Sequence, residues 1–333
     1  MCSASLRART VPAVKAAVYD ETGPPEVLRY ADVPDPTPGQ GEVLISVEAI
    51  SIEGGDTLNR AGGLMPASPH IVGYQCAGTI AVLGDGVTDR SVGQRVVATM
   101  AWGSHAELAV TPSLVTWLVP EDADIQKVAC VPVAYGTAHD CLFEFGRLQP
   151  GETVLVQAGA SGVGVAAIQL AKRAGAAVLA TASSESRLNR LWPLGLDVGI
   201  DYTVDGWVDR VRAATKGRGV DLAVDSVGGS ILQGSLQCLG YRGRCITVGQ
   251  AGREGKLVDL STLGAQNQSI TGVFLGAEIA SPRAQTIIQE LVEDVAAGTI
   301  EVLIDRTYPL AEAAAAHAYI ESRQAVGRVV LVP

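Results

Sequence analysis

One stretch of the sequence joins an apolar run to a helix-like run through three closely spaced glycines: TVLVQAGASGVGVAAIQLA, residues 153–171. The apolar part, 153–158, is typical of a buried strand. After the glycines, apolar residues recur on one face of a helix, at Val163, Ala166, Ala167, Leu170, Ala171 and Ala174. The stretch therefore predicts a strand, a tight turn and a helix.

Glycines at a strand-to-helix turn let the backbone approach a bound pyrophosphate. The N-terminus of the helix adds unpaired N–H groups and a partial positive charge. The alternative is that glycine serves only the close packing of strand and helix. In this context we favour a dinucleotide-binding loop, here called the glycine loop: Gly159, Ala160, Ser161, Gly162, Val163 and Gly164.

Strand-like and helical segments alternate along the middle of the chain. Further apolar runs follow at 176–182, 197–202, 220–227, 244–250 and 269–275. The segment SESRLNRLWPLG, which follows the run at 176–182, is helix-like. This alternation predicts an α/β fold with a parallel, doubly wound sheet.

The flanking segments have a different pattern. Before about residue 135 the sequence has short strand-like runs, such as VLISVEAISI at 43–52, which suit a barrel or sandwich. The tail, 282–333, reads as helix, strand, helix, strand, and could complete the first domain.

The residues after the 176–182 strand indicate which dinucleotide binds. NAD-binding proteins place an acidic residue there, but the expected position is Ala182, followed by Ser183, Ser184 and Arg187. Small hydroxyls and a cation suit a 2′-phosphate, so we expect NADPH. The alternative is that these residues only cap the following helix.

Charge and composition exclude several classes of partner. A net charge of −10 makes nucleic acid or an anionic membrane a poor partner, and no apolar run is long enough to span a bilayer. The six cysteines, Cys2 included, contain no C-x-x-C pair, which favours reduced thiols in the cytoplasm. The first 14 residues read as an N-terminal extension rather than a signal peptide.

Taken together, the motifs resemble the medium-chain dehydrogenase/reductase superfamily, and within it the zinc-free quinone oxidoreductase group that includes zeta-crystallin. The resemblance runs from Lys15 to Val332. Its markers are AGASGVG, DSVGG at 225–229, ITVGQAG at 246–252, SITGVFLG at 269–276 and AHAYIESRQAVGRVVLV near the end. These motifs specify no substrate.

The resemblance implies a GroES-like β-barrel catalytic domain and a Rossmann domain with the active site between them. We expect the catalytic domain at 1–136, the Rossmann domain at 137–276 and completion of the catalytic domain at 277–333. It also implies a homodimer paired through the Rossmann sheet. Further cofactor contacts are expected at Thr137, Tyr202, Val227, Gly249, Phe274, Leu275 and Arg328, with Arg187 at the 2′-phosphate.

Zinc-dependent relatives need three protein ligands, and the matching positions here lack them. In SIEGGD, Glu53 stands at the position of the first ligand, a cysteine in those relatives. Tyr74-Gln75 stand where His-Glu is usual, and Val133 stands at the position of the third ligand, also a cysteine. One carboxylate makes no zinc site, so we expect no metal. Without a Lewis acid, hydride addition to a quinone or an α,β-unsaturated carbonyl is easier than interconversion of alcohol and ketone.

Four residues are candidates for catalysis. Tyr74 and Tyr135 could each hydrogen-bond the developing enolate, or could only form the wall of the pocket. Glu53, where the branch usually has asparagine, could contact the nicotinamide ribose, favour an unusual substrate, or pair with Arg60 or another basic residue. Asp56 matches the family and is expected to hydrogen-bond within the cleft.

Two other functions remain open. An enoyl-thioester or polyketide-type enone reductase is weakened because Leu64 replaces the tyrosine that such enzymes often use. A different class is a structural or regulatory NADPH-binding protein with little turnover. His317 is expected to be a packed histidine rather than a catalyst.

Overall fold

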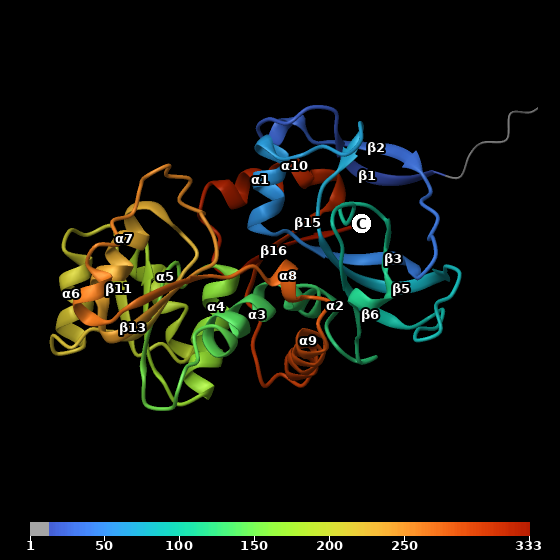
Figure 1. The fold of residues 1–333 in the computed structure, drawn as a ribbon. Helices are drawn as coiled ribbons and strands as arrows, with labels where there is room; N and C mark the ends of the chain where they lie inside the picture. Colours follow the sequence, from blue (N-terminus) through green and yellow to red (C-terminus); the bar gives the residue numbers. More distant parts are fainter. Residues whose placement is uncertain (1–12) are drawn as a thin grey trace, which may run out of the picture.

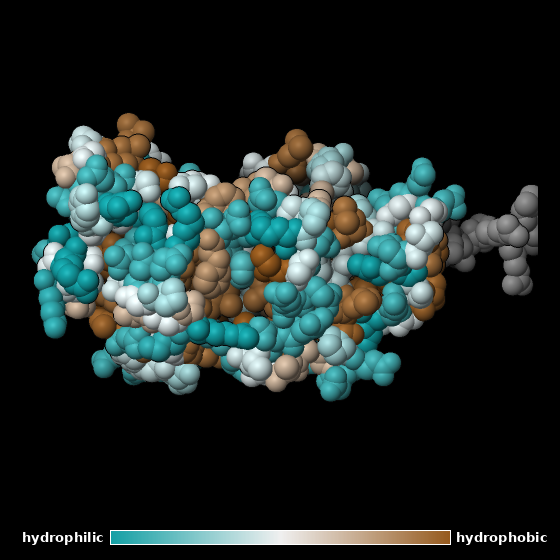
Figure 2. All heavy atoms as spheres, turned by 60° about the horizontal axis from the view of Figure 1, so that its bottom comes forward, coloured by the Kyte–Doolittle hydropathy of each residue, from teal (hydrophilic) through white to brown (hydrophobic). Residues whose placement is uncertain are grey.

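The computed structural model describes residues 13–333 in two parts, each built around a β-sheet (Figure 1). Cys2 and most of the predicted N-terminal extension lie outside these residues. In the described part, no helix is long and apolar enough to cross a membrane. On the face shown in Figure 2, hydrophobic side chains are scattered among hydrophilic ones.

The central part of the chain forms a six-stranded parallel sheet in the order β11-β10-β9-β12-β13-β14. Its strands are β9 Thr153–Val156, β10 Ala177–Ala182, β11 Val198–Asp201, β12 Val220–Asp225, β13 Leu239–Thr247 and β14 Ser269–Gly272. This order, which reverses direction at β9, is the doubly wound arrangement predicted from the alternating pattern.

Helices cover both faces of this sheet. Val154 and Val156 of β9 pack into one hydrophobic core with α4, whereas Leu155 between them packs into another with α6 and α7. Each face is thus buried, which explains the nearly continuous apolar strands. The helices are α3 Val131–His139, α4 Gly162–Arg173, α5 Glu185–Asn189, α6 Trp207–Ala214, α7 Gly229–Cys238 and α8 Leu275–Glu278.

Two helical segments differ from a single regular helix. The segment predicted as one helix after β10 divides into α5 and a 3₁₀ turn, Trp192–Leu194. Pro193 explains the break, because proline lacks an N–H and disfavours the α conformation in the residue before it. α3 runs on into a π-helical segment, Asp140–Glu144, so it continues through the predicted domain boundary at 136/137.

The N-terminal part contains a mainly antiparallel sheet in the order β15-β16-β3-β5-β6-β8, with β7 also paired to β3, and a small sheet, β2-β1-β4. Its strands are β1 Ala13–Tyr19, β2 Arg29–Pro34, β3 Glu42–Ser51, β4 His70–Ile71, β5 Gln75–Leu83, β6 Arg95–Thr99, β7 Leu108–Pro112 and β8 Thr116–Leu118. Short helices α1 Gly54–Gly62 and α2 Ile125–Val128 belong to the same part.

The C-terminal segment adds two strands to this sheet. β16, Arg328–Val332, pairs antiparallel with β3, and β15, Ile304–Pro309, pairs parallel with β16. α9, Pro282–Ala296, packs on α3, while α10, Ala313–Glu321, lies beside α1 (Figure 1). The residue bounds of the domains remain a prediction.

β16 also contacts the glycine loop. Gly327 N donates to Ala160 O at 2.7 Å, and Ser161 forms a parallel bridge with Gly327. Gly327 has φ +90°, and a Cβ there would lie 2.2 Å from Leu303 O. Glycine is therefore required at 327, and it brings the next residue, Arg328, onto the loop.

Candidate active and cofactor site

The glycine loop leads from the end of β9 into α4. Ser161 caps the helix, its Oγ accepting from Gly164 N at 3.0 Å. A Cβ on Gly164 would lie 2.4 Å from Ala158 O, and one on Gly159 would lie 2.8 Å from the Ala180 Cβ. The close packing and the helix N-terminus both fit a dinucleotide pyrophosphate, so packing and binding are not exclusive explanations.

A buried chain of hydrogen bonds lies beneath this loop and was not anticipated from the sequence. Thr181 Oγ1 donates to Gln157 Oε1 at 2.6 Å, and Gln157 Nε2 donates to Ser235 Oγ at 3.0 Å. Ser235 Oγ donates to Asp225 Oδ2 at 2.8 Å, and Asp225 Oδ1 accepts from Val227 N at 2.9 Å. The chain ties together the carboxyl ends of β9, β10 and β12, where a ligand binds in such sheets.

The residues predicted at the 2′-phosphate gather at the end of β10. Arg187 Nη1 donates to Ser183 Oγ at 3.2 Å, and the guanidinium also donates to the carbonyls of Arg323 and Ala325. Tyr202 N donates to Ala182 O at 3.1 Å. Ser184 is the N-cap residue of α5, without a side-chain capping bond.

Arg323 was missed by sequence reasoning, although it lies within the AHAYIESRQAVGR motif. Its Nη2 donates to Ala251 O at 3.2 Å. Its backbone carbonyl accepts from the Arg187 guanidinium, so the segment after α10 contacts the residues expected at the 2′-phosphate.

The other predicted cofactor residues are spread along the strand ends. Gly252 N donates to Val227 O at 2.9 Å, and a Cβ on Gly249 would lie 3.0 Å from Ser226 O. Thr137 is buried in α3, and Leu275 is buried against Gly136. The Phe274 side chain is 76% exposed, which distinguishes it from its buried neighbour.

Glu53 and Arg328, predicted for separate roles, form a buried ion pair. Arg328 Nη2 also donates to Ser51 Oγ at 2.6 Å and to Ile52 O at 2.7 Å. Burial raises the pKa of the Glu53 carboxyl, and the Arg328 guanidinium opposes that rise. Of the alternatives for Glu53, the structure has the ion pair, with Arg328 and not Arg60 as partner.

Gln75 completes this cluster, here called the Glu53 network: Ser51, Glu53, Gln75 and Arg328. Gln75 Nε2 donates to Ala129 O at 2.6 Å and to Glu53 Oε1 at 3.2 Å. Its Oε1 accepts from Val133 N at 2.6 Å. Both ends of the amide are therefore used inside the protein.

Asp56 and Tyr74 lie beside this network. Asp56 is fully buried, and its Oδ2 accepts from Glu53 N at 2.8 Å, which closes the first turn of α1. Burial raises the pKa of Asp56 well above its usual range. The Tyr74 hydroxyl packs over Gly55, where a Cβ would lie 2.5 Å from it. Burial, together with the carboxylates of Asp56 and Glu53, raises the pKa of Tyr74 above its ordinary value.

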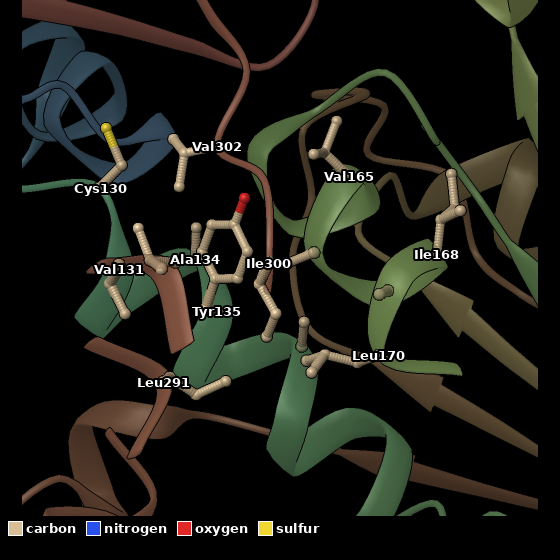
Figure 3. Close-up of a cluster of buried hydrophobic side chains, with 14 of the residues drawn as sticks. Cys130, Val131, Ala134, Tyr135, Val165, Ile168, Leu170, Leu291, Ile300 and Val302 are labelled. Carbon is tan, nitrogen blue, oxygen red and sulfur yellow. The ribbon is translucent and has the colours of Figure 1, made fainter. Parts of the chain in front are cut away.

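The structure argues against Tyr135 as a proton donor. Its ring is 1% exposed within the core between α3 and α4, close to Val131, Ile300 and Val302 (Figure 3). Its hydroxyl donates to Glu301 O at 2.7 Å. Tyr135 is the fifth residue of the buried helix α3 and lies in the core rather than in the cleft, which explains the difference from the prediction.

The positions that match metal ligands in zinc-dependent relatives do not fit a zinc ion. Glu53 is paired with Arg328, Gln75 is committed to the backbone, and Val133 offers no donor side chain. Among residues 13–333, no three His, Cys, Asp or Glu side chains are grouped to hold a metal. His317 lies outside the site, where its Nε2 is 3.1 Å from His105 Nε2.

Both parts of the chain match known protein families. A family described as "Alcohol dehydrogenase GroES-like domain" matches residues 39–121, and one described as "Zinc-binding dehydrogenase" matches 194–331. The chain is 33% identical over 332 residues to "2-haloacrylate reductase" from Burkholderia sp, covering 96% of this chain and 99% of that protein. It is 33% identical over 316 residues to "Quinone oxidoreductase" from Pseudomonas aeruginosa, covering 93% and 97%.

A solved structure shares the fold at full length. Escherichia coli quinone oxidoreductase complexed with NADPH superimposes with a TM-score of 0.91 at 28% identity, covering 96% of this chain and 100% of that one. The neighbour's NADPH and the relatives' reductase names indicate an oxidoreductase that uses a nicotinamide cofactor. With matches in both parts and relatives aligned over nearly their whole length, the chain belongs to the quinone oxidoreductase branch of the medium-chain dehydrogenase/reductase superfamily, the group that includes zeta-crystallin.

Proposed function

We propose that this protein is a zinc-independent, NADPH-dependent reductase that adds hydride to quinones or α,β-unsaturated carbonyl compounds. One observation carries the proposal: the glycine loop fits a dinucleotide, while the positions of the zinc ligands are occupied by the Glu53 network. The relatives named as a reductase and an oxidoreductase support the same type of reaction.

The chain's own residues would hold the cofactor along the strand ends. The N-terminus of α4 would face the pyrophosphate, and the loop at Val227, fixed by Asp225, would border the dinucleotide. When bound, NADPH supplies the hydride. The protein orients it and excludes water, as the buried surroundings of Asp56 and Glu53 favour.

Tyr74 is the proposed hydrogen-bond donor to the substrate oxygen. Because its pKa is raised, the phenol stays protonated near neutral pH and can donate to developing negative charge. Delocalisation of charge in a quinone or enone makes one or two such hydrogen bonds sufficient. Asp56 and Glu53 shape the site behind this ring.

The preference for NADPH over NADH rests on charge at the end of β10. Ser183, Ser184 and Arg187 present hydroxyls and a guanidinium group there, and Ala182 adds no carboxylate. A doubly charged phosphate favours such a site. We further propose a cytoplasmic homodimer, with no nucleic-acid or membrane partner.

The proposal is tested by following NADPH oxidation by absorbance with phenanthrenequinone, a simple enone, a 2-haloacrylate and crotonyl-CoA. We expect turnover of the quinone or the enone, with NADPH preferred over NADH. Faster turnover of crotonyl-CoA would favour the enoyl-thioester alternative. Tight NADPH binding with no turnover of any acceptor would favour the non-enzymatic one.

A second measurement tests whether Arg187 binds the 2′-phosphate. Arg187→Ala should weaken NADPH binding about tenfold or more and leave NADH binding unchanged, since only NADPH has the 2′-phosphate. Equal loss for both cofactors would contradict a 2′-phosphate site at Arg187. Metal analysis of protein purified without chelator tests zinc independence.

A further inference from the structure

The Arg328 guanidinium uses its nitrogens unequally. Nε donates to Ser51 Oγ at 3.1 Å, and Nη2 donates to Ser51 Oγ, Ile52 O and the Glu53 carboxylate. Within residues 13–333, Nη1 donates to no protein oxygen. The Nε and Nη2 side of the planar guanidinium is therefore held by protein acceptors, while Nη1 carries two available N–H donors.

The free side faces the glycine loop. A Cβ on Gly162, the first residue of α4, would lie 2.5 Å from Arg328 Nη1 and 2.6 Å from its Cδ. The bridge between Ser161 and Gly327 sets this approach from the backbone. Available guanidinium donors and the N-terminus of a twelve-residue helix thus point to the same place, and both favour an anionic oxygen.

Among the groups that hold the guanidinium in this orientation, Glu53 alone carries a charge that opposes its own. Both side chains of the pair are buried, so either would be strongly disfavoured without the other. A neutral amide at 53, of the kind usual in this branch, could accept one hydrogen bond but would not neutralise Arg328. The Glu53 carboxylate therefore supplies the charge that the buried guanidinium needs.

We propose that Glu53 is a positioning residue that holds the Arg328 guanidinium so that its Nη1 donors contact a phosphate oxygen on the nicotinamide side of the bound dinucleotide. The inference rests on the proposed function for the identity of the cofactor. It adds a task for Glu53 that involves no contact with the substrate. It also explains why alanine at position 162 would disturb the site.

The test measures binding directly, by the fluorescence of NADPH on addition of protein. Glu53→Gln keeps the size of the side chain and removes its charge, and should weaken NADPH binding about tenfold. The adenosine bisphosphate half of NADPH, which lacks the nicotinamide-side phosphate, should bind both proteins equally. Glu48→Gln, at an exposed position on the preceding strand β3, is the matched control and should bind NADPH normally.

A double variant tests whether Glu53 acts through Arg328. Once Arg328→Gln has removed the guanidinium, adding Glu53→Gln should cause little further loss of NADPH affinity, because no group is left to orient. If Glu53→Gln does not fold, Glu53→Asn, the residue usual in this branch, replaces it in both experiments.

Three results would overturn the inference: unchanged NADPH affinity in Glu53→Gln, equal weakening of NADPH and its adenosine half, or additive losses in the double variant. Because binding needs no acceptor, these results are distinct from failure of the proposed function. A protein that turns over no acceptor but shows the expected binding pattern would refute the reductase proposal alone.

Discussion

Tyr74 is the residue whose surroundings most define its chemistry. Its hydroxyl lies over Gly55, which leaves room for the oxygen only because no Cβ is present. Burial and two carboxylates keep the phenol neutral, so it is available as a hydrogen-bond donor over the ordinary pH range.

Tyr74→Phe should lower kcat with a quinone or enone roughly tenfold to a hundredfold and leave NADPH affinity unchanged, because one donor to the developing oxyanion is lost. The native enzyme should show no loss of rate from titration of this residue between about pH 6 and pH 9. Steady-state kinetics check both statements. An unchanged kcat in Tyr74→Phe would assign the ring a packing role.

A second residue-scale feature is the buried pair His105 and His317. Both are fully buried with facing Nε2 atoms, and burial lowers the pKa of His105 to about 3 and that of His317 well below its usual range. In the unfolded chain these groups titrate near their ordinary pKa of about 6.5. Between these values the unfolded state binds more protons than the folded state.

The two histidines should therefore lower the free energy of unfolding on acidification, whereas Glu53 and Asp56, whose pKa values are raised, act in the opposite direction. The contribution of each histidine is complete above about pH 6.5 and falls by up to about 1.4 kcal/mol per pH unit as the pH drops below it. Denaturant unfolding at a series of pH values measures this slope. Replacing both histidines by glutamine should flatten it, and an equally steep slope in that variant would place its origin elsewhere.

At the scale of elements, α4 and α9 begin in the same way. Ser161 Oγ accepts from Gly164 N at 3.0 Å, and Ser281 Oγ accepts from Ala284 N at 3.2 Å. Only the first of these helices starts at the glycine loop. The pair therefore separates helix capping from cofactor binding.

Ser161→Ala and Ser281→Ala should each lower the free energy of unfolding by about 1 kcal/mol, the usual effect of losing an N-cap. Only Ser161→Ala should also weaken NADPH binding. Denaturant unfolding and fluorescence titration measure the two effects. Weakened binding in Ser281→Ala would mean that helix stability alone controls the cofactor site.

Helices and strands were predictable where the pattern of apolar residues was long, and a break in a helix is explained where proline interrupts that pattern. α4 and the six parallel strands follow from apolar periodicity, and the division of the helix after β10 follows from Pro193, although it was not predicted. The π-helical continuation of α3 has no such signal. Tyr135 was expected in the cleft because nothing in AYGTAHD indicates which side of α3 faces the core.

At the scale of the whole molecule, contacts between distant segments were the least predictable. Glu53 and Arg328 are 275 positions apart and were each assigned a different task, because spacing along a chain does not reveal a pairing across a sheet. The contribution of the C-terminal segment to the N-terminal sheet was expected mainly through the family resemblance. Gln75 could have been found from Tyr74-Gln75 standing where His-Glu is usual.

The proposed homodimer is a prediction at this scale. β14 lies at the edge of the six-stranded sheet, and within residues 13–333 no strand pairs with its outer side. Such an edge is a ready template for a second copy. Light scattering during gel filtration at micromolar concentration should give twice the mass of one chain, and the mass of a single chain would contradict the proposal.

The junction between Gly327 and the glycine loop has a consequence for biosynthesis. β16 is translated after every other strand, yet Gly327 just before it supplies the backbone donor to Ala160, and its first residue, Arg328, supplies the guanidinium beside Gly162. A nascent chain that has already completed the parallel sheet still lacks these groups. On the role proposed for Arg328, the protein gains full affinity for its cofactor only after this last strand has left the ribosome, so earlier folding intermediates should bind NADPH more weakly than the native protein.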